Sequence, residues 1–320
     1  MRTEKEKITL DCKVDSYRSG WTVVEFLSHR FKYHPPERWT NRVDDGRVKV
    51  NGHRVEANHV VGHEDVVSYT ILHNEPEVDF SYDVIYEDED MLAVSKSGNL
   101  PVHACGVYIR NTLITQLRRR YGDRISLGHR LDRETSGLVL LSKHVPAARA
   151  LSGMFARGEV EKEYRAVVHG RVMSDTFEVD APIGKTENII PMAGDRETMR
   201  GRETDLREDF PRFIAKRIVD FENGKPARTI FRVLERAHGY SILHAQPLSG
   251  RTNQIRVHLH HAGHPLVGDK VYRYAEPAVG VDGIGRHALH CRTMTFAHPT
   301  SGRRMSLTAE LPKDLQIFAR

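Results

Sequence analysis

The sequence predicts an α+β protein, in which a mixed, mainly antiparallel β-sheet carries flanking helices and follows a small N-terminal α/β module. Short apolar segments of strand character outnumber the amphipathic helical segments, and many of them are joined by brief turns that contain Gly or Pro. The polar, proline-containing stretch at residues 73–81 interrupts this pattern and indicates a linker. We therefore expect one module over residues 1–74 and a larger domain over residues 82–320.

The N-terminal module is expected to pack two helices on a small sheet. In the segment SGWTVVEFLSHRF, residues 19–31, apolar side chains recur at near-helical spacing, and a second short helix is expected around Glu37–Val43, after two consecutive prolines. The pair Asn51-Gly52 is a strong hairpin signal, because both residues tolerate the positive φ angles of a tight turn. Residues 66–71, which are rich in β-branched side chains, are the expected returning strand.

The larger domain alternates between strand-like and helix-like patterns. Helices are expected at residues 111–122 and 145–158, and strands or hairpins at residues 82–98, 138–142, 161–170, 229–247 and 288–311. Residues 186–225 carry many charges of both signs and little periodicity. We expect this segment to be a surface insertion that is partly helical near Phe213–Val219.

Composition limits the classes of protein to which the chain can belong. No apolar run approaches the roughly 18 residues that cross a bilayer, and the charged N-terminus lacks the apolar stretch of a secretory signal. We therefore expect a cytoplasmic protein without a membrane partner, with a monomer as the default state. The three cysteines, Cys12, Cys105 and Cys291, show neither zinc-site spacing nor a disulfide framework. The net charge of +5 is compatible with a polyanionic partner such as nucleic acid.

The segment GHRLDRETSGLVLLSK, from Gly128 to Lys143, places Asp132 between two arginines in a polar loop that leads into a buried strand. Nearby Arg charges favour the ionised form of a carboxylate that is shielded from water, and an ionised carboxylate beside a concave surface can act as a nucleophile or a base. The alternative is an aspartate that caps a turn through its side chain. The residues alone leave both interpretations open and favour the turn aspartate.

This segment resembles the signature motif of the RluA-type RNA pseudouridine synthases, because the pattern H-R-L-D-x-x-T-S-G is present without a gap. The resemblance extends over roughly residues 82–310 and implies that Asp132 is the catalytic nucleophile. The segment EKEYRAVVHG resembles the part of the family that carries an active-site tyrosine, which implies this role for Tyr164. The block G-R-T-N-Q-I-R resembles the one whose final arginine pairs with the catalytic aspartate, which implies this role for Arg256. Asn253 departs from the family, which usually has histidine at this position.

The resemblance also implies that RNA is the partner. Residues 46–71 are similar to the end of an S4-like RNA-binding domain, so the N-terminal module is expected to bind RNA. A base inside a folded RNA must be flipped out of its stack before it can react, and Arg130 is a candidate to fill the vacated space. The residues expected to contact the RNA are His129, Arg130, Arg133, Arg251 and Gln254.

No cofactor and no metal are expected, because the implied isomerisation changes no oxidation state and brings in no external group. His258, His260, His261 and His264 form a dense group, and His260 and His264 are expected to share a helix face, as zinc ligands can. No cysteine or glutamate lies nearby in sequence to complete such a site, and the resemblance explains the block as scaffold.

The leading hypothesis is therefore an RNA pseudouridine synthase that isomerises specific uridines in structured RNA, either 23S ribosomal RNA or transfer RNA. Asp132 acts either by attack at C1′ or by promoting formation of a glycal, and the sequence does not separate these routes. The alternative from another class is a non-catalytic RNA-binding or RNA-chaperone protein on the same scaffold. A nucleic-acid hydrolase would need paired carboxylates or metal ligands, which these motifs lack.

Overall fold

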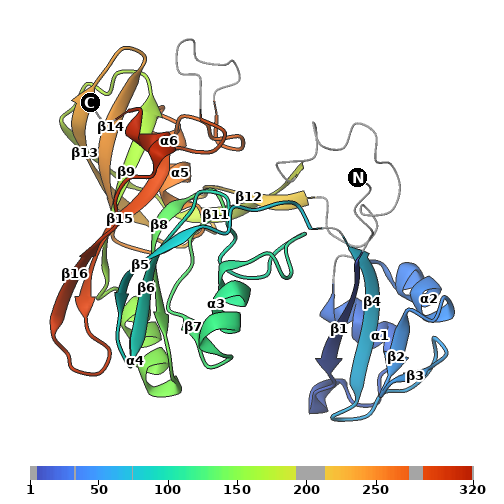
Figure 1. The fold of residues 1–320 in the computed structure, drawn as a ribbon. Helices are drawn as coiled ribbons and strands as arrows, with labels where there is room; N and C mark the ends of the chain where they lie inside the picture. Colours follow the sequence, from blue (N-terminus) through green and yellow to red (C-terminus); the bar gives the residue numbers. More distant parts are fainter. Residues whose placement is uncertain (1–5, 32–33, 74, 192–212, 274–283, 319–320) are drawn as a thin grey trace. The chain divides into compact units, whose positions relative to one another are not determined.

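The computed structural model describes residues 6–31, 34–73, 75–191, 213–273 and 284–318. The described residues form two compact units, one ending at Glu75 and the other beginning at Pro76 (Figure 1). None of the helices in these ranges is long and apolar enough to cross a membrane.

The first unit combines a four-stranded antiparallel sheet, in the order β1-β4-β2-β3, with two α-helices. Its elements are β1 (Glu6–Lys13), a 3-10 turn (Ser16–Arg18), α1 (Val23–Arg30), α2 (Pro36–Asp44), β2 (Val48–Val50), β3 (His53–Arg54) and β4 (Val66–His73). Both helices and the strands after them agree with the prediction, but the sequence pattern did not predict β1. Ile8, Leu10 and Cys12 do alternate with polar residues, and the charged residues around them hide this signal.

The packing of this unit depends on Trp39, whose side chain is completely buried. Its ring lies 5.9 Å from that of Phe31 and 5.4 Å from that of Tyr69, measured between centroids. α1 begins at Val23 because Thr22 and Glu25 form a capping box, in which each side chain accepts a hydrogen bond from the backbone N–H of the other residue.

The second unit is built on a ten-stranded mixed sheet, in the order β10-β13-β14-β9-β15-β8-β6-β5, with β16 paired to β15 and β7 paired to β8. Its strands are β5 (Tyr82–Glu87), β6 (Met91–Lys96), β7 (Ser126–Leu127), β8 (Ser136–Ser142), β9 (Glu161–His169), β10 (Thr176–Asp180), β13 (Arg228–Arg236), β14 (Tyr240–Pro247), β15 (Leu289–Ala297) and β16 (Arg304–Thr308). Among these described strands, β8 and β15 run parallel and the other pairs are antiparallel. This arrangement confirms the predicted mixed, mainly antiparallel sheet.

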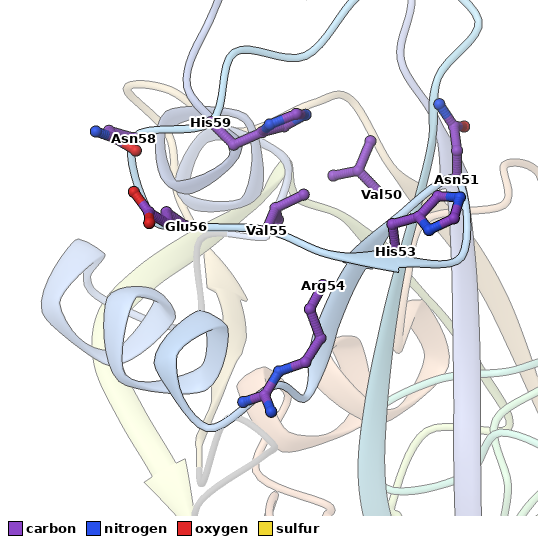
Figure 2. A pocket seen from close by; sticks show the side chains of 8 residues that line it. All are labelled: Val50, Asn51, His53, Arg54, Val55, Glu56, Asn58 and His59. Atoms are coloured by element: carbon purple, nitrogen blue, oxygen red, sulfur yellow. The ribbon is translucent and has the colours of Figure 1, made fainter.

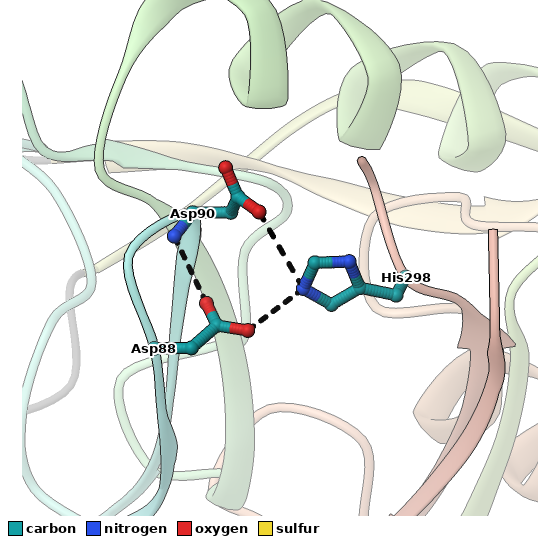
Figure 3. Close-up of side chains that lie close together, drawn as sticks. All are labelled: Asp88, Asp90 and His298. Atoms are coloured by element: carbon teal, nitrogen blue, oxygen red, sulfur yellow. Dashed lines mark hydrogen bonds and ion pairs between the residues drawn. The ribbon is translucent and has the colours of Figure 1, made fainter. Parts of the chain in front are cut away.

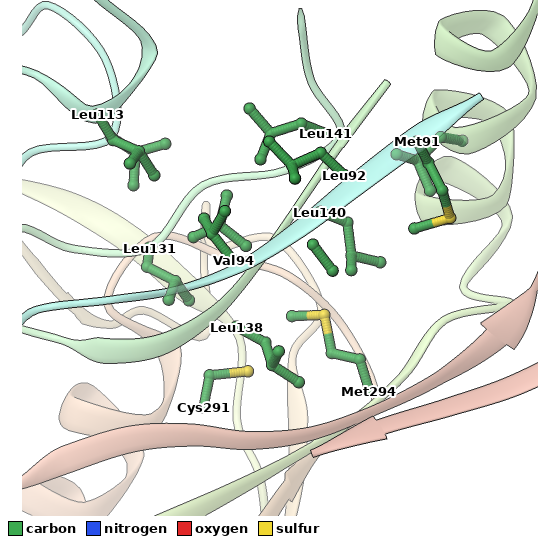
Figure 4. Packing of buried hydrophobic residues seen from close by; sticks show 14 of the residues in the cluster. Met91, Leu92, Val94, Leu113, Leu131, Leu138, Leu140, Leu141, Cys291 and Met294 are labelled. Atoms are coloured by element: carbon green, nitrogen blue, oxygen red, sulfur yellow. The ribbon is translucent and has the colours of Figure 1, made fainter. Parts of the chain in front are cut away.

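Two hydrophobic clusters hold the three longest helices of this unit to its sheet. The helices are α3 (Leu113–Tyr121), α4 (Val145–Arg157), α5 (Gln254–His261) and α6 (Lys313–Gln316). Side chains of β6 and β8 fill the first cluster together with those of α3 and α4 (Figure 4), and α5 packs on β13 and β14 in the second. All seven residues of β8 are buried, which explains why its sequence is a nearly continuous apolar run.

The expectation of a helix near Phe213–Val219 is wrong, because these residues form the strand β12. β12 pairs antiparallel with β11 (Ile183–Pro191), from the pair Ile183–Val219 to the pair Pro191–Phe213. A partner strand more than twenty residues away supplies its hydrogen bonds, and local periodicity contains no information about such a partner. Residues 192–212 of the predicted insertion lie outside the described residues.

Gly137 permits the parallel contact between β8 and β15. It pairs with Cys291, and a Cβ atom at this position would lie only 2.2 Å from the carbonyl oxygen of Cys291. Its φ angle of +107° also lies in the region that residues with a side chain rarely adopt. The glycine of the T-S-G sequence is therefore needed where the loop that carries Asp132 enters the sheet.

Replacing Gly137 by Ala should lower the free energy of unfolding of the second unit by about 2–4 kcal/mol, since it adds both a backbone clash and a strained φ angle. Amide hydrogen exchange in β8 and β15 is the suitable measurement, because both tryptophans, Trp21 and Trp39, report on the first unit. Gly285→Ala is the matched control, since a Cβ atom there meets open space. Equal protection in both variants would contradict this account of Gly137.

Candidate active site

The loop at residues 128–135 presents Asp132 at the edge of the first hydrophobic cluster. Leu131 is 7% exposed and packs in that cluster, whereas the side chain of Asp132 keeps 24% of its surface exposed. The carbonyl group of Arg133 accepts a hydrogen bond from the buried ammonium group of Lys96 at 3.0 Å. Lys96 therefore anchors the backbone of the loop, while the carboxylate of Asp132 remains accessible to solvent.

Arg256 of α5 is the direct partner of Asp132. Its Nη1 atom donates to Oδ2 of Asp132 at 2.9 Å, and its Nε and Nη2 atoms donate to the two carboxylate oxygens of Asp269 at 2.7 and 3.0 Å. Asp269 is itself held by the backbone N–H groups of Val271 and Tyr272. The guanidinium group also lies against the ring of Tyr272, 5.0 Å from its centroid. These contacts fix the plane of the guanidinium group and direct Nη1 at Asp132.

Arg256 and Asp269 form an ionised pair. Burial alone would lower the pKa of Arg256, but hydrogen bonds and charge attraction from Asp269, together with Asp132, raise it above its ordinary value. Burial alone would raise the pKa of Asp269, and the donors of Arg256 hold it below its usual range. The partner of Asp132 is therefore a permanent positive charge.

Tyr164 lies on β9, paired with Ala245 of β14 on one side and with Cys291 of β15 on the other. Its ring packs against both hydrophobic clusters. Burial raises the pKa of its hydroxyl well above the ordinary value, and the nearby Cys291 thiol and Asp132 carboxylate add to this effect. Tyr164 is therefore protonated at neutral pH and lies close enough to Asp132 to respond to its charge.

The residues expected to contact RNA fall into two groups. Arg130 and Arg251 are exposed, as an RNA contact requires. Gln254 is 4% exposed, and its amide forms four hydrogen bonds within the fold, at 2.7–3.0 Å. Gln254 is therefore engaged within the fold, where its donors and acceptor hold the start of α5.

His129 and Arg133 support the loop instead of facing away from it. Nε2 of His129 accepts the backbone N–H of Leu140 at 3.0 Å, and burial lowers the pKa of His129 to about 3, so this ring is neutral and turned inward. Arg133 donates to the hydroxyl of Tyr108 and to the carboxylate of Glu134, each at 2.8 Å. His129 and Arg133 are therefore both engaged in hydrogen bonds within the fold.

Three residues of the network were missed at the sequence level: Lys96, Asp269 and Tyr272. Asp269 and Tyr272 lie in GDKVY, residues 268–272, which begins twelve positions after Arg256, the last residue of the G-R-T-N-Q-I-R block. A buried arginine needs a carboxylate partner, and this requirement was the available signal for Asp269. Lys96, the last residue of β6, is 2% exposed.

Among the four histidines near α5, His258 is buried and belongs to the scaffold, whereas His260 and His261 are exposed. α5 ends at His261, so the expectation that His260 and His264 share a helix face is wrong. Nδ1 of His258 contacts the hydroxyl of Thr229 at 2.9 Å, and Nε2 contacts the carbonyl of Ala181 at 3.0 Å. Both ring nitrogens of the most buried histidine are therefore used to join α5 to the sheet.

A separate cluster of Asp88, Asp90 and His298 has the residue types of a metal site (Figure 3). Nε2 of His298 lies 2.8 Å from Asp88 and 4.0 Å from Asp90. Asp88 also accepts the hydroxyl of Tyr86, and Asp90 pairs with His144 at 2.7 Å. These contacts tie the turn between β5 and β6 to the end of β15 and to the start of α4, which is a structural role.

A hollow of about 490 Å³ lies in the first unit, lined by side chains of β2, β3 and the loop that follows (Figure 2). Asn51, Arg54 and His59 are among its polar residues. Neither Asp132 nor its partners Arg256 and Asp269 line this hollow. The candidate active site is the accessible carboxylate of Asp132, one oxygen of which accepts a hydrogen bond from the clamped guanidinium group of Arg256.

Comparison with known proteins finds relatives over the part of the chain that contains this site. The family model for RNA pseudouridylate synthase matches residues 90–261, which include Asp132, Tyr164 and Arg256. The uncharacterised RNA pseudouridine synthase YlyB of Bacillus subtilis is 34% identical over 287 residues, covering 85% of this chain and 84% of that protein.

Two further similarities concern a ribosomal enzyme and a solved structure. The ribosomal large subunit pseudouridine synthase C of Haemophilus ducreyi is 30% identical and covers 94% of this chain and 91% of that protein. The human RNA pseudouridylate synthase domain containing 1 has a TM-score of 0.54 at 25% identity, covering 75% of this chain and 87% of that chain. The chain therefore belongs to the RluA-type RNA pseudouridylate synthase family and is an isomerase that converts uridine to pseudouridine in RNA.

Proposed function

We propose that Asp132 is the nucleophile of this isomerase and that the enzyme acts on RNA of the large ribosomal subunit. The observation that carries the proposal is the 2.9 Å contact between Asp132 and Arg256, which are 124 positions apart in the chain. A desolvated ion-pair network adds little net stability, because the loss of hydration offsets most of the charge attraction. The network of Arg256 and Asp269 lies beside the accessible carboxylate of Asp132, and this position supports a role for the network in the reaction.

The residues account for each bond that must change. In the direct route, a carboxylate oxygen of Asp132 bonds to C1′ while the C1′–N1 bond breaks and its electron pair leaves with uracil. The uracil turns, C5 bonds to C1′, the bond to Asp132 breaks, C5 loses a proton and N1 gains one. In the glycal route, Asp132 removes a proton from C2′ as the C1′–N1 bond breaks and its electron pair leaves with uracil. After the uracil turns, C5 bonds to C1′ of the glycal while Asp132 returns the proton to C2′, and C5 then loses a proton and N1 gains one. Both routes place the same carboxylate beside the ribose.

Tyr164 is proposed to contact the uracil. Its ring offers a flat apolar face for the base, and its hydroxyl can form a hydrogen bond with it. Because the pKa of the hydroxyl is raised, Tyr164 meets the base in its protonated form. It therefore acts in proton movement as a donor or relay, and not as a phenolate base.

The RNA contacts are proposed to come from both parts of the chain. Residues 82–320 are assigned as the catalytic domain, in which Arg130 and Arg251 are exposed near the Asp132 loop and α5. Residues 1–74 are assigned as an S4-like RNA-binding module, supported by the two helices packed on a small sheet. Flipping a base costs a few kcal/mol, which contacts to the flanking RNA must offset.

Large-subunit ribosomal RNA is the preferred substrate, because relatives named ribosomal large subunit pseudouridine synthases C and D cover most of this chain. Transfer RNA is the second candidate. We also place the protein in the cytoplasm, in line with the ribosomal names of its relatives, and take a monomer as the default working state.

Asp132→Asn tests the nucleophile, because it keeps the size of the side chain and removes its charge. The single-turnover rate of pseudouridine formation should fall by about 10⁴-fold, with RNA affinity changed less than about threefold. Asp123→Asn, at an exposed turn after α3, serves as the control for the loss of one negative charge. A purified Asp132→Asn enzyme that retains the wild-type rate would refute the assignment.

The substrate is tested by chemical mapping of pseudouridines in ribosomal and transfer RNA, with and without the gene for this protein. We expect one or a few sites in large-subunit ribosomal RNA to disappear on deletion. The wild-type gene should restore them and the Asp132→Asn gene should not. Loss of a transfer RNA site alone would redirect the substrate assignment, and an unchanged map would favour the non-catalytic RNA-binding alternative.

A further inference from the structure

Asn253 lies beside the catalytic carboxylate, at the position where the resemblance led us to expect histidine. It is the N-cap residue of α5 and adopts a left-handed conformation, with φ 58° and ψ 20°. Asparagine is among the few residues with a side chain that adopt this conformation readily. The backbone therefore brings the Asn253 amide to the same end of α5 from which Arg256 reaches Asp132.

The hydrogen-bond partners decide how this amide is oriented. With its nitrogen toward Asp132, it donates to Oδ2 at 2.9 Å and to Oδ1 at 3.2 Å, and its oxygen accepts the Tyr272 hydroxyl at 3.1 Å. The reverse orientation keeps a contact of 3.1 Å from the amide nitrogen to Tyr272 but sets the amide oxygen against both carboxylate oxygens. A carboxylate offers acceptors, so only the first orientation satisfies both ends of the amide.

Tyr272 is placed to hold the amide in this orientation. It is 1% exposed, and burial raises the pKa of its hydroxyl, so the hydroxyl keeps its proton. The hydroxyl oxygen accepts the backbone N–H of Arg217 at 3.1 Å, which leaves its proton to be donated to Asn253. The same side chain supports Arg256 through its ring. Tyr272 thus touches both of the groups that donate to Asp132.

We propose that Asn253 is a positioning residue for the catalytic step, which orients the carboxylate of Asp132 through hydrogen bonds to both of its oxygens and is itself oriented by the hydroxyl of Tyr272. Arg256 binds one carboxylate oxygen, and a carboxylate held at one oxygen can still rotate about that contact. The second donor removes this rotation and leaves a defined lone pair for C1′. The inference rests on the proposed function, because it needs Asp132 to be the reacting group.

Single-turnover kinetics on a uridine-containing RNA substrate test the proposal, with RNA affinity measured separately for each variant. Asn253→Ala should lower the rate constant about 10–100-fold and leave RNA affinity within about threefold of wild type, because a displaced reacting group slows the chemical step. Asn253→Asp, which keeps the shape but repels Asp132, should be at least as slow. Asn253→His restores a donor and should recover part of the rate. Asn223→Ala, at an exposed turn before β13, is the matched control.

The role of Tyr272 is tested by a double-mutant cycle. Tyr272→Phe keeps the ring beneath Arg256 and removes only the hydroxyl, so we expect a loss of about 3–10-fold in the wild-type background and no further loss in Asn253→Ala. Losses that multiply would show that Tyr272 does not act through Asn253 and would overturn that link.

The outcomes separate this inference from the proposed function. An Asn253→Ala enzyme within twofold of the wild-type rate, while Asp132→Asn is inactive, overturns the inference alone. A loss confined to RNA affinity also overturns it, because it would make Asn253 a binding residue. Activity in Asp132→Asn refutes the proposed function itself.

Discussion

The clamp on Arg256 is the interaction on which the rest of the site depends. Asp269 binds two of its nitrogens and Tyr272 supports its face, so the remaining nitrogen has one direction in which to donate. In that direction, Nη1 of Arg256 donates to Oδ2 of Asp132. Since burying an arginine without a partner would carry a large desolvation penalty, Asp269 is required before Arg256 can occupy this position. The ionised partner of Asp132 is thus built into the core and does not depend on the arrival of RNA.

The sheet explains how residues so distant in sequence come together. The loop that carries Asp132 enters β8, and the parallel contact of β8 with β15, made possible by Gly137, brings it beside β9 and Tyr164. Tyr164 lies at the junction of the two hydrophobic clusters, and α5 packs on the second of them. One rigid framework therefore positions Asp132, the proposed nucleophile, and Tyr164, the ring proposed to contact the base. Pre-organisation of this kind removes the need to reorder charged groups during the reaction.

Much of the fold was predictable because its helices and hairpins carry local patterns. The helix predicted at residues 111–122 is α3, and the hairpin predicted at residues 229–247 is β13 and β14. β12 was mistaken for a helix because its partner is distant. In the site, local sequence favoured a turn for Asp132, and agreement among separated motifs changed that interpretation. Asp269 and Tyr272 were missed because their roles arise only from contacts with Arg256 in the folded chain.

The central claim is that the accessible carboxylate of Asp132 reacts with the ribose of a flipped uridine. A structure of this protein in complex with its uridine-containing RNA tests it most directly. The account predicts that an oxygen of Asp132 lies within about 3.5 Å of C1′ of the target nucleotide, with the uracil against the ring of Tyr164 and Arg256 still bound to Asp132. A complex in which the flipped nucleotide occupies another surface, with Asp132 facing no ribose carbon, would contradict it.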